Sequence, residues 1–350
     1  MSRPVVSVVI PTFNRSYCIA TALASIQNQT WTEWEALVVD DGSTDDTESV
    51  VAALRRVDPR IKYFRQDNRG VSAARNAGLD RASGRLIAFL DSDDAWLPWK
   101  LEAQIACLER LRSVGMVWTD MDAVDPTGQV VMRRYLRRMY GAYRYFADND
   151  LFEKSEPAPA LDPLSAENAG PPHGTLVRWG DLYPKMFAGN LVHTSTVLMT
   201  RDRLDTAGRF EETFRTGEDY QFHLRTCRGG PVALLDASTV LYRLPGGADQ
   251  LTAPQFMLQV AANSLRTREM VLATDRDRIT LPAAMIREIM TEANASVAEK
   301  LFEAGKYRES RPYFFRSGRY AISRPRLVLK AALTTMPACV PRLVMRARRR

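Results

Sequence analysis

Acidic residues follow two apolar runs in the first hundred residues, in an arrangement that suits the chemistry of phosphates. Residues 91–94 (Asp-Ser-Asp-Asp) come directly after the run 86–90, and residues 40–43 (Asp-Asp-Gly-Ser) directly after the run 35–39. Carboxylate oxygens bind hard divalent cations, which neutralise the charge on a departing diphosphate. Each cluster alone is also typical of a strand end followed by a capped turn or helix, where Asp, Gly and Ser are common.

Two further segments combine charge with a predicted helix start. Residues 68–78 place a glycine-bearing loop before a helix, whose N–H groups and dipole attract phosphate, and Arg75 adds a guanidinium fork for an anion. Glu218 and Asp219 begin another predicted helix, where a carboxylate could act as a general base on a hydroxyl group. The same features also fit a surface helix ended by Gly78 and an acidic helix start favoured by the helix dipole.

An alternation of strands and helices over the first 120 residues would bring these segments together. The apolar runs predict strands at 5–10, 35–39, 61–64, 86–90 and 114–119. The helical spacing of apolar residues predicts helices at 14–29, 47–57, 71–81 and 99–112. Such alternation predicts an α/β fold with a mostly parallel sheet covered on both faces. Ligands of these sheets bind at the carboxyl ends of the strands, which is where both acidic clusters stand.

The pattern changes after residue 132. A stretch rich in proline, alanine and glycine over 133–185 predicts an irregular insertion or flexible lid. Strands are expected at 191–200 and 232–242, and a helix start at 218–225. Residues 254–320 read as helical, with a helix–turn–helix that turns at Gly305.

Composition and charge bound the class of protein. The 350 residues are 45% hydrophobic and 25% charged, with a net charge of +7, values ordinary for a globular protein. Residues 306–350 hold thirteen Lys or Arg and one acidic residue, so the remainder is mildly acidic. The basic end is interpreted either as a solvated disordered tail or as an interfacial segment for an anionic membrane, with nucleic acid a weaker reading.

The four cysteines are scattered, which argues against a zinc site or a disulfide framework. We find no apolar run long enough to span a membrane and no signal peptide. The expectation is therefore a cytoplasmic protein, with peripheral contact at the inner face of the cell membrane and no nucleic-acid partner. The oligomeric state does not follow from the sequence.

The four segments, taken in order, resemble the inverting glycosyltransferases of family 2, which have the GT-A fold. The resemblance rests on residues 6–15, 39–45, 70–78 and 89–94, is strong over 5–120 and returns over 190–252. It implies a Rossmann-like GT-A domain over 1–250, with a variable acceptor-side insertion at 133–190. A helical region at 251–322 and a basic amphipathic tail at 323–350 would follow.

The resemblance also implies roles for individual residues. Asp219 would be the catalytic base, Asp93 the principal ligand of Mn²⁺ or Mg²⁺, and Glu218 an acceptor contact. His193 is assigned to the acceptor side, with a pocket-wall or core histidine as the plainer reading. The donor contacts would be Pro11, Thr12, Asn14, Arg15, Asp41, Gly42, Asn68, Gly70, Arg75, Asn76, Asp91, Ser92, Tyr242 and Arg243.

The chain departs from the family pattern in two places. Many relatives carry a histidine soon after the Tyr-Arg pair, whereas Leu244 and Pro245 follow Tyr242-Arg243 here, so no histidine ligand is expected from that segment. The Gln-x-x-Arg-Trp motif of processive relatives is also absent, which favours transfer of a single sugar.

The expected activity is transfer of a sugar from a nucleotide-diphosphate donor, with UDP-sugars favoured, to a glycan or lipid-linked acceptor in polysaccharide or cell-envelope synthesis. Two alternatives remain open. A sugar nucleotidyltransferase usually needs a glycine-rich, lysine-bearing N-terminal loop, and residues 11–15 (Pro-Thr-Phe-Asn-Arg) have no glycine. A non-catalytic adaptor with the same fold would bind the nucleotide sugar without turning it over.

Overall fold

The structure is a computed structural model that describes residues 4–161, 170–244, 254–322 and 325–335. The chain divides into two compact units, Met1–Gly246 and Gly247–Arg350. The tail expected at 323–350 lies outside the described residues except for 325–335.

Four parallel strands form the N-terminal half of the sheet, close to where the apolar runs predict them. They are β1 (Val6–Thr12), β2 (Trp34–Asp40), β3 (Ile61–Arg65) and β4 (Leu86–Phe89). β1 lies between β2 and β4, with Val6 opposite both Trp34 and Leu86. Every residue of β1, β2 and β4 is buried, because both faces of this part of the sheet are covered, and this accounts for their unbroken apolar runs.

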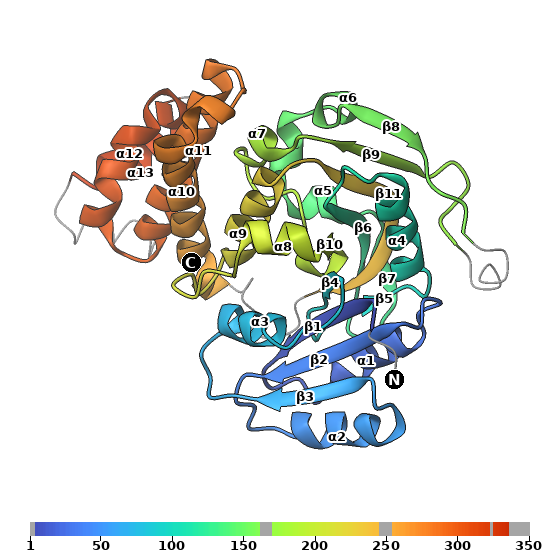
Figure 1. Cartoon of the computed structure of the whole chain (residues 1–350). Helices are drawn as coiled ribbons and strands as arrows, with labels where there is room; N and C mark the ends of the chain where they lie inside the picture. The colour runs from blue at the N-terminus through green and yellow to red at the C-terminus, as the bar shows by residue number, and fades with distance from the viewer. Residues whose placement is uncertain (1–3, 162–169, 245–253, 323–324, 336–350) are drawn as a thin grey trace. The chain divides into compact units, whose positions relative to one another are not determined.

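Helices cover both faces of these strands. They are α1 (Ile19–Gln27), α2 (Thr47–Val57), α3 (Val71–Leu79) and α4 (Lys100–Arg110). The path from β1 to β2 to β3 runs one way across the sheet, and the path from β3 to β4 returns. Right-handed crossovers therefore place α3 on the face opposite to α1 and α2 (Figure 1). At Gly78 of α3, a Cβ atom would come within 2.5 Å of Val9 Cγ1, so α3 packs on β1 and is not a surface helix.

The second half of the sheet mixes directions. Its strands are β5 (Ala95–Trp96), β6 (Met116–Val124), β7 (Val130–Met132), β8 (Lys154–Pro157), β9 (Leu176–Gly180), β10 (Leu198–Thr200) and β11 (Val232–Arg243). The strand order is β3-β2-β1-β4-β10-β6-β11-β9-β8, with β5 paired to β11 and β7 to β6. β10 is antiparallel to β4 and to β6 and joins the two halves.

Two secondary-structure predictions are wrong in part. The stretch 133–185 is not irregular throughout, because β8 and β9 pair with each other and β9 pairs with β11. It also contains α5 (Leu136–Met139), η1 (Gly141–Tyr145), α6 (Asp148–Leu151) and α7 (Tyr183–Met186). The strand expected over 191–200 is limited to β10, and the 3-10 turn η3 (Thr194–Thr196) precedes it. Residues 190–195 leave the strand path because their polar groups bind carboxylates elsewhere in the chain.

Two helices follow β10. α8 (Arg201–Ala207) begins at Thr200, whose side chain accepts a hydrogen bond from the Arg203 N–H. α9 (Glu218–Arg228) begins after Gly217, whose φ of 74° is the left-handed conformation that glycine adopts at no steric cost. This turn aims the first two side chains of α9 at the carboxyl edge of the sheet.

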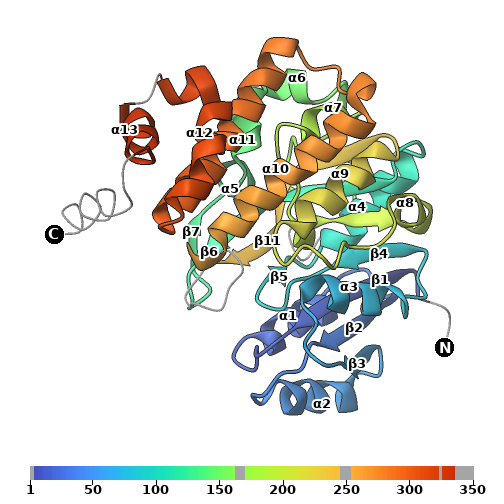
Figure 2. The same ribbon diagram turned by 90° about the vertical axis from the view of Figure 1, so that its left-hand side faces the viewer.

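The C-terminal unit is helical, as expected. It contains η4 (Pro254–Phe256), α10 (Met257–Thr274), η5 (Arg276–Arg278), α11 (Ala283–Glu303), α12 (Tyr307–Ile322) and α13 (Pro325–Leu333). α11 packs against both α10 and α12 (Figure 2), and the turn predicted at Gly305 is confirmed, with a φ of 76°. Its core includes Phe302, Phe314 and Leu327. Among the described residues, no helix is both long and apolar enough to cross a bilayer.

Candidate active site

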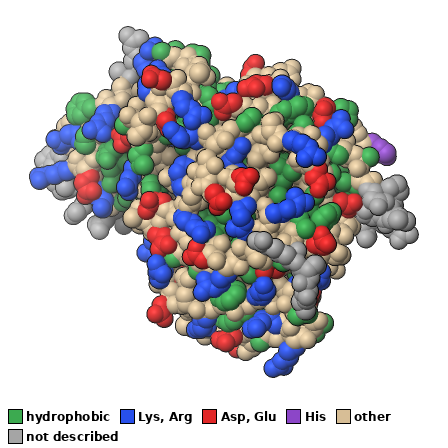
Figure 3. Space-filling model, viewed as in Figure 1, with side chains coloured by type: hydrophobic (Ala, Val, Ile, Leu, Met, Phe, Trp, Pro, Cys, Tyr) green, Lys and Arg blue, Asp and Glu red, His purple; other side chains and the backbone are tan. Residues whose placement is uncertain are grey.

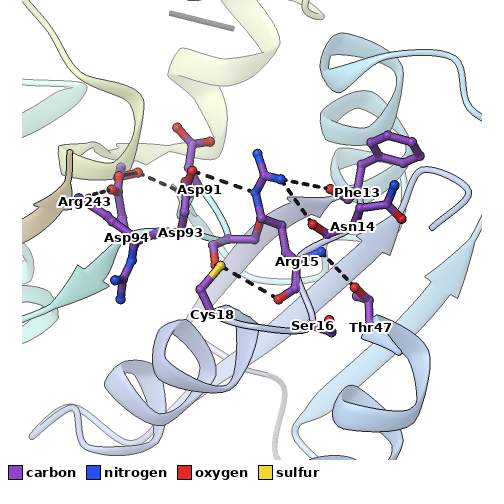
Figure 4. Close-up of polar contacts among 12 residues, drawn as sticks. Phe13, Asn14, Arg15, Ser16, Cys18, Thr47, Asp91, Asp93, Asp94 and Arg243 are labelled. Carbon is purple, nitrogen blue, oxygen red and sulfur yellow. Dashed lines mark hydrogen bonds and ion pairs between the residues drawn. The ribbon is translucent and has the colours of Figure 1, made fainter. Parts of the chain in front are cut away.

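The acidic residues after β4 form a tight turn at the carboxyl edge of the sheet. The Asp94 N–H donates to the Asp91 carbonyl at 3.0 Å, and the Asp91 N–H donates to Ser195 Oγ at 3.1 Å. Figure 4 shows Arg15, which follows β1, reaching toward this turn, with Nε 3.9 Å from Asp93 Oδ2. We call residues 91–94 the acidic turn. The segment that follows β1 and the acidic turn that follows β4 therefore lie next to each other.

Asp94 ties the acidic turn to the second half of the sheet. Its side chain is only 1% exposed, and its Oδ2 accepts hydrogen bonds from Ser195 Oγ at 2.7 Å and from His193 Nε2 at 3.1 Å. Its Oδ1 accepts from the Arg243 N–H at 3.3 Å. A single buried carboxylate thus fixes the loop before β10 and the end of β11, which explains how residues 100 to 150 positions apart meet here.

The carboxylates of the acidic turn lie close enough together to raise the pKa of one of them. Burial, then the charges of Asp94 and Asp91, raise the pKa of Asp93 from 3.8 to about 6. For Asp91, burial acts to raise the pKa, but the charges of Arg75 and then His193 outweigh it and lower the pKa. The fold therefore concentrates carboxylates that would be stabilised by an added cation.

The residues present fit a divalent cation. Asp91, Asp94 and His193 each offer one ligand atom, and these atoms lie within 4.8 Å of one another. Asp93 belongs to the same turn, and its raised pKa reflects the crowding of negative charge. Carboxylate oxygens with one imidazole suit Mn²⁺, and the oxygens alone suit Mg²⁺. The imidazole in this group is that of His193, which comes from a different segment than the one after Arg243.

Arg75 connects the acidic turn to α9. Its Nη2 donates to Asp91 Oδ1 and its Nη1 to Glu218 Oε1, both at 2.8 Å, and its side chain is 5% exposed. Burial and then the charge of Asp219 raise the pKa of Glu218 to about 7, against the effect of Arg75. Sequence reasoning placed Arg75 at the donor diphosphate. In the structure, both of its terminal nitrogens bind carboxylates of the site.

Asp219 lies in the first turn of α9, beside the same charges. Its Oδ2 accepts a hydrogen bond from Asn190 Nδ2 at 2.9 Å. Burial raises its pKa, the Tyr220 N–H and the positive charges of Arg75 and His193 act to lower it, and Asp91 acts to raise it. Because these groups belong to the acidic turn and its partners, Asp219 shares one site with residues 91–94.

The donor-side residues come together at the ends of β1 and β2. The Asn14 N–H donates to Ser43 Oγ, and the Thr44 N–H donates to Asn14 Oδ1, both at 2.8 Å. Asn14 adopts a φ of 52°, the left-handed region that Asn tolerates better than most residues. Pro11 and Thr12 end β1 next to this contact. The loop after β1 and the loop after β2 are thereby locked together.

Asp41, predicted to face the base, has its carboxylate engaged within the fold. Its Oδ1 accepts from the Arg69 N–H at 2.9 Å and from Gln66 Nε2 at 2.8 Å, and its Oδ2 accepts from the Gly70 N–H at 2.8 Å. Asp41 thus shapes the loop that opens α3, which contains Asn68 and Gly70. Gly42 adopts a φ of 85°, a conformation that favours glycine, and a Cβ there would lie only 3.1 Å from the Asn68 nitrogen.

Asn76 and Ser92 make hydrogen bonds with residues that border the site. The Asn76 amide exchanges two hydrogen bonds with the backbone of Phe210, each at 2.9 Å. The Ser92 carbonyl accepts a hydrogen bond from the buried Cys18 thiol at 3.4 Å. Both residues hold segments that border the site.

His193 lies between the acidic turn and a group of tyrosines. Its ring meets that of Tyr242 edge to face, with centroids 5.2 Å apart, and its Nδ1 is 3.3 Å from Tyr140 Oη. Tyr135 stacks on Tyr242 at 5.8 Å. Arg243 donates from Nε to the Asp93 carbonyl at 3.3 Å, so the predicted Tyr-Arg pair does border the acidic turn.

Sequence reasoning missed Tyr140, Asn190 and Ser195. They contact His193, Asp219 and Asp94, respectively. The only sequence signal near any of them is the concentration of tyrosines after residue 133. Asn190 and Ser195 have no recognisable spacing relative to the carboxylates that they contact.

A mixed, mostly parallel sheet with a carboxylate cluster at its carboxyl edge is the architecture of the GT-A glycosyltransferases. Residues 7–155 match the family model described as glycosyl transferase family 2. The chain thus carries a domain of glycosyltransferase family 2, which confirms the predicted family.

A curated relative supports the same family. A protein named GalNAc(5)-diNAcBac-PP-undecaprenol beta-1,3-glucosyltransferase, from Campylobacter jejuni, is 49% identical over 96 residues. The match covers 27% of this chain and 31% of that protein. The chain therefore spans about a third of the length of this relative.

Solved structures support the fold. TarS residues 1–349 from S. aureus in complex with UDP-GlcNAc gives a TM-score of 0.55 at 19% identity, covering 93% of this chain and 87% of that one. The mannosyltransferase PcManGT from Pyrobaculum calidifontis, in complex with GDP-Man and Mn²⁺, gives 0.56 at 17% identity, covering 98% and 87%. These likenesses confirm the predicted GT-A fold.

Proposed function

We propose that this chain is an inverting, metal-dependent glycosyltransferase, which transfers a single sugar from a nucleotide-diphosphate donor to a hydroxyl group. The proposal rests on the two ion pairs that Arg75 makes, with Asp91 and with Glu218. They join the acidic turn to the start of α9. Carboxylates suited to a metal-bound diphosphate and a buried carboxylate suited to proton abstraction therefore share one site.

Asp219 is the general base of this proposal. It removes the proton of the acceptor hydroxyl, whose oxygen attacks the anomeric carbon on the face opposite to the diphosphate, and the electrons of the broken C–O bond leave with the diphosphate. A buried carboxylate with a raised pKa suits this task, because a stronger base takes the proton more readily. Glu218 and His193 would contact the acceptor.

The donor lies along the carboxyl ends of β1, β2 and β4 in this proposal. Mn²⁺ or Mg²⁺, held by Asp93 with Asp91, Asp94 and His193 beside it, would neutralise the departing diphosphate. The two complexed neighbours hold UDP-GlcNAc and GDP-Man, which supports a nucleotide-sugar donor. We favour a UDP-sugar. The donor contacts remain Pro11, Thr12, Asn14, Arg15, Asp41, Gly42, Asn68, Gly70, Arg75, Asn76, Asp91, Ser92, Tyr242 and Arg243.

The acceptor that we propose is a lipid-linked glycan at an anionic membrane surface, in cell-envelope or polysaccharide synthesis. The name of the Campylobacter relative includes PP-undecaprenol, a lipid diphosphate. In the C-terminal unit, Phe315, Val328 and Leu329 are exposed by 74%, 43% and 42%. Basic and apolar side chains lie close together over these helices in Figure 3. This combination suits peripheral binding to headgroups, at the inner face of the cell membrane.

The test is a donor screen by thermal shift, with UDP-glucose, UDP-GlcNAc and GDP-mannose, each with and without Mn²⁺. A true donor should raise the melting temperature more in the presence of Mn²⁺. Turnover, followed as release of UDP or GDP, should fall by about 10²–10⁴-fold in Asp219→Asn while donor binding persists. Binding without turnover, unaffected by this substitution, would instead favour a non-catalytic adaptor.

A further inference from the structure

The loop before β10 carries a polar side chain aimed at the start of α9. We propose that Asn190 is a positioning residue for Asp219, holding the carboxylate in one orientation and favouring its ionised form. This inference rests on the proposed function, because it assigns a task to the neighbour of the general base. Nothing in the family resemblance or in the spacing of the sequence assigns a role to this residue.

The amide group of Asn190 has only one orientation that satisfies both of its contacts. Its Oδ1 accepts a hydrogen bond from the Val192 N–H at 3.1 Å, and its Nδ2 donates to Asp219 Oδ2 at 2.9 Å. A flipped amide would place a donor against the backbone N–H and an oxygen against the carboxylate. The backbone of its own loop therefore aims the Asn190 donor at Asp219.

The loop itself is held from two sides. Tyr143 Oη donates to the Leu191 carbonyl at 2.7 Å, in a contact between two buried residues. At its other end, His193 Nε2 lies 3.1 Å from Asp94 Oδ2, and the His193 carbonyl accepts from Thr196 Oγ1 at 2.6 Å. A loop fixed at both ends positions its side chains with the precision that a catalytic group requires.

The hydrogen bond acts on the protonation of Asp219 in a definite direction. An amide N–H donates to a carboxylate and favours the charged form, whereas burial and the charge of Asp91 oppose it. The other groups facing Asp219 are Arg75, His193, Glu218, Tyr140 and the Tyr220 N–H. Unlike the Arg75 guanidinium, the Asn190 amide is uncharged, so it orients the Asp219 carboxylate without adding a charge to the site.

The consequence for activity is a shift in pH dependence. Without the Asn190 donor, Asp219 would hold its proton to higher pH, so the acid limb of the profile of kcat against pH should move upward. In Asn190→Ala, we expect this limb to rise by about one pH unit, with kcat at pH 7 lower by about 10–100-fold and the donor KM within about threefold. Asn190→Asp should move the limb at least as far, because a second carboxylate opposes ionisation.

The measurement uses the full-length protein, with release of UDP or GDP from UDP-glucose, UDP-GlcNAc or GDP-mannose as the assay. Val192→Ala is the matched control, because it loosens the same loop while leaving the Asn190 amide in place. This control should lower the melting temperature and leave the acid limb unchanged. The inference would be overturned if the pH of the acid limb does not change in Asn190→Ala, or if it changes equally in Val192→Ala.

A second readout needs no turnover. In protein labelled with ¹³C at the aspartate carboxyl carbons, the resonance missing from Asp219→Asn identifies Asp219, and its titration gives the pKa directly. Asn190→Ala should raise that value, and Val192→Ala should not. If no donor is turned over by the unsubstituted protein, the proposed function fails, while this titration still decides the role of Asn190.

Discussion

At the scale of single residues, Asp93 shows the effect of crowding several carboxylates in one site. Burial and the charges of Asp94 and Asp91 raise its pKa from 3.8 to about 6. Because the pKa of the folded state lies above that of the unfolded chain, ionised Asp93 lowers the stability of the fold above pH 6, and this loss vanishes below about pH 4. Perturbed pKa values of this kind are typical of functional sites.

Asp93→Asn should therefore stabilise the metal-free protein. At pH 8 in EDTA, we expect the free energy of unfolding in urea to rise by about 2 kcal/mol, with the gain shrinking as the pH falls through 6. The same variant should lose the added stability that Mn²⁺ gives with a donor. Asp94→Asn is the control and should destabilise, because Asp94 accepts hydrogen bonds from Ser195 and His193. Equal stability of Asp93→Asn and the unsubstituted protein at pH 8 would contradict this account.

At the scale of elements, Arg75 of α3 holds the acidic turn and α9 together through two ion pairs, a buried one with Glu218 and a partly buried one with Asp91. Removing one partner of a buried ion pair leaves its charged neighbours without compensation, which costs about 3–5 kcal/mol. A substitution at Arg75 would leave two carboxylates, Asp91 and Glu218, in this condition. The pairing of these elements therefore depends on one guanidinium group.

Arg75→Met should lower the free energy of unfolding by about 3–5 kcal/mol, measured by urea unfolding at pH 8. The matched control is Arg69→Met, which removes an ion pair with Glu212 whose side chains are 63% and 41% exposed. That pair is worth less than about 1 kcal/mol because water screens it. If the two variants lose similar stability, the buried bridge does not hold these elements together.

The sequence predicted elements well where the signal was local. β1, β2 and β4 are continuous apolar runs because both faces of each are covered, and the helices between them show clear spacing. Residues 191–200 include apolar and β-branched side chains, which predicted a strand, but the path of residues 190–196 is set by contacts with Asp94 and Asp219, about 100 and 30 positions away. No local pattern reports such contacts.

The same limit applies to the candidate site. The carboxylates Asp91 and Asp93 could be singled out from the sequence, because they stand together after a predicted strand and in the order that the family resemblance requires. Asn190 and Tyr140 are single polar residues in a variable stretch, and their importance depends on what lies opposite them in space. Arg75 was recognised, but its two carboxylate partners became evident only in the structure.

At the scale of the whole molecule, the C-terminal unit and the basic end of the sequence carry the proposed membrane contact. Each Lys or Arg near an anionic bilayer contributes about 1 kcal/mol, so several together support reversible attachment. A chain shortened at residue 322 should bind vesicles that contain anionic lipid much more weakly than the full chain. Neutral vesicles are the control, and neither chain should bind them strongly. Equal retention of the shortened chain on anionic vesicles would remove this part of the proposal.

β10 joins the two halves of the sheet although it lies far from both in the sequence, since its residues 198–200 pair with β4 and β6, which end at residues 89 and 124. While the chain is being synthesised, β4 and β6 leave the ribosome long before the strand that separates them. The nascent protein therefore carries an open edge on β4 until about residue 200 has emerged. The N-terminal strands can pair early, but Asp94 gains its partners His193 and Ser195 only at this late stage.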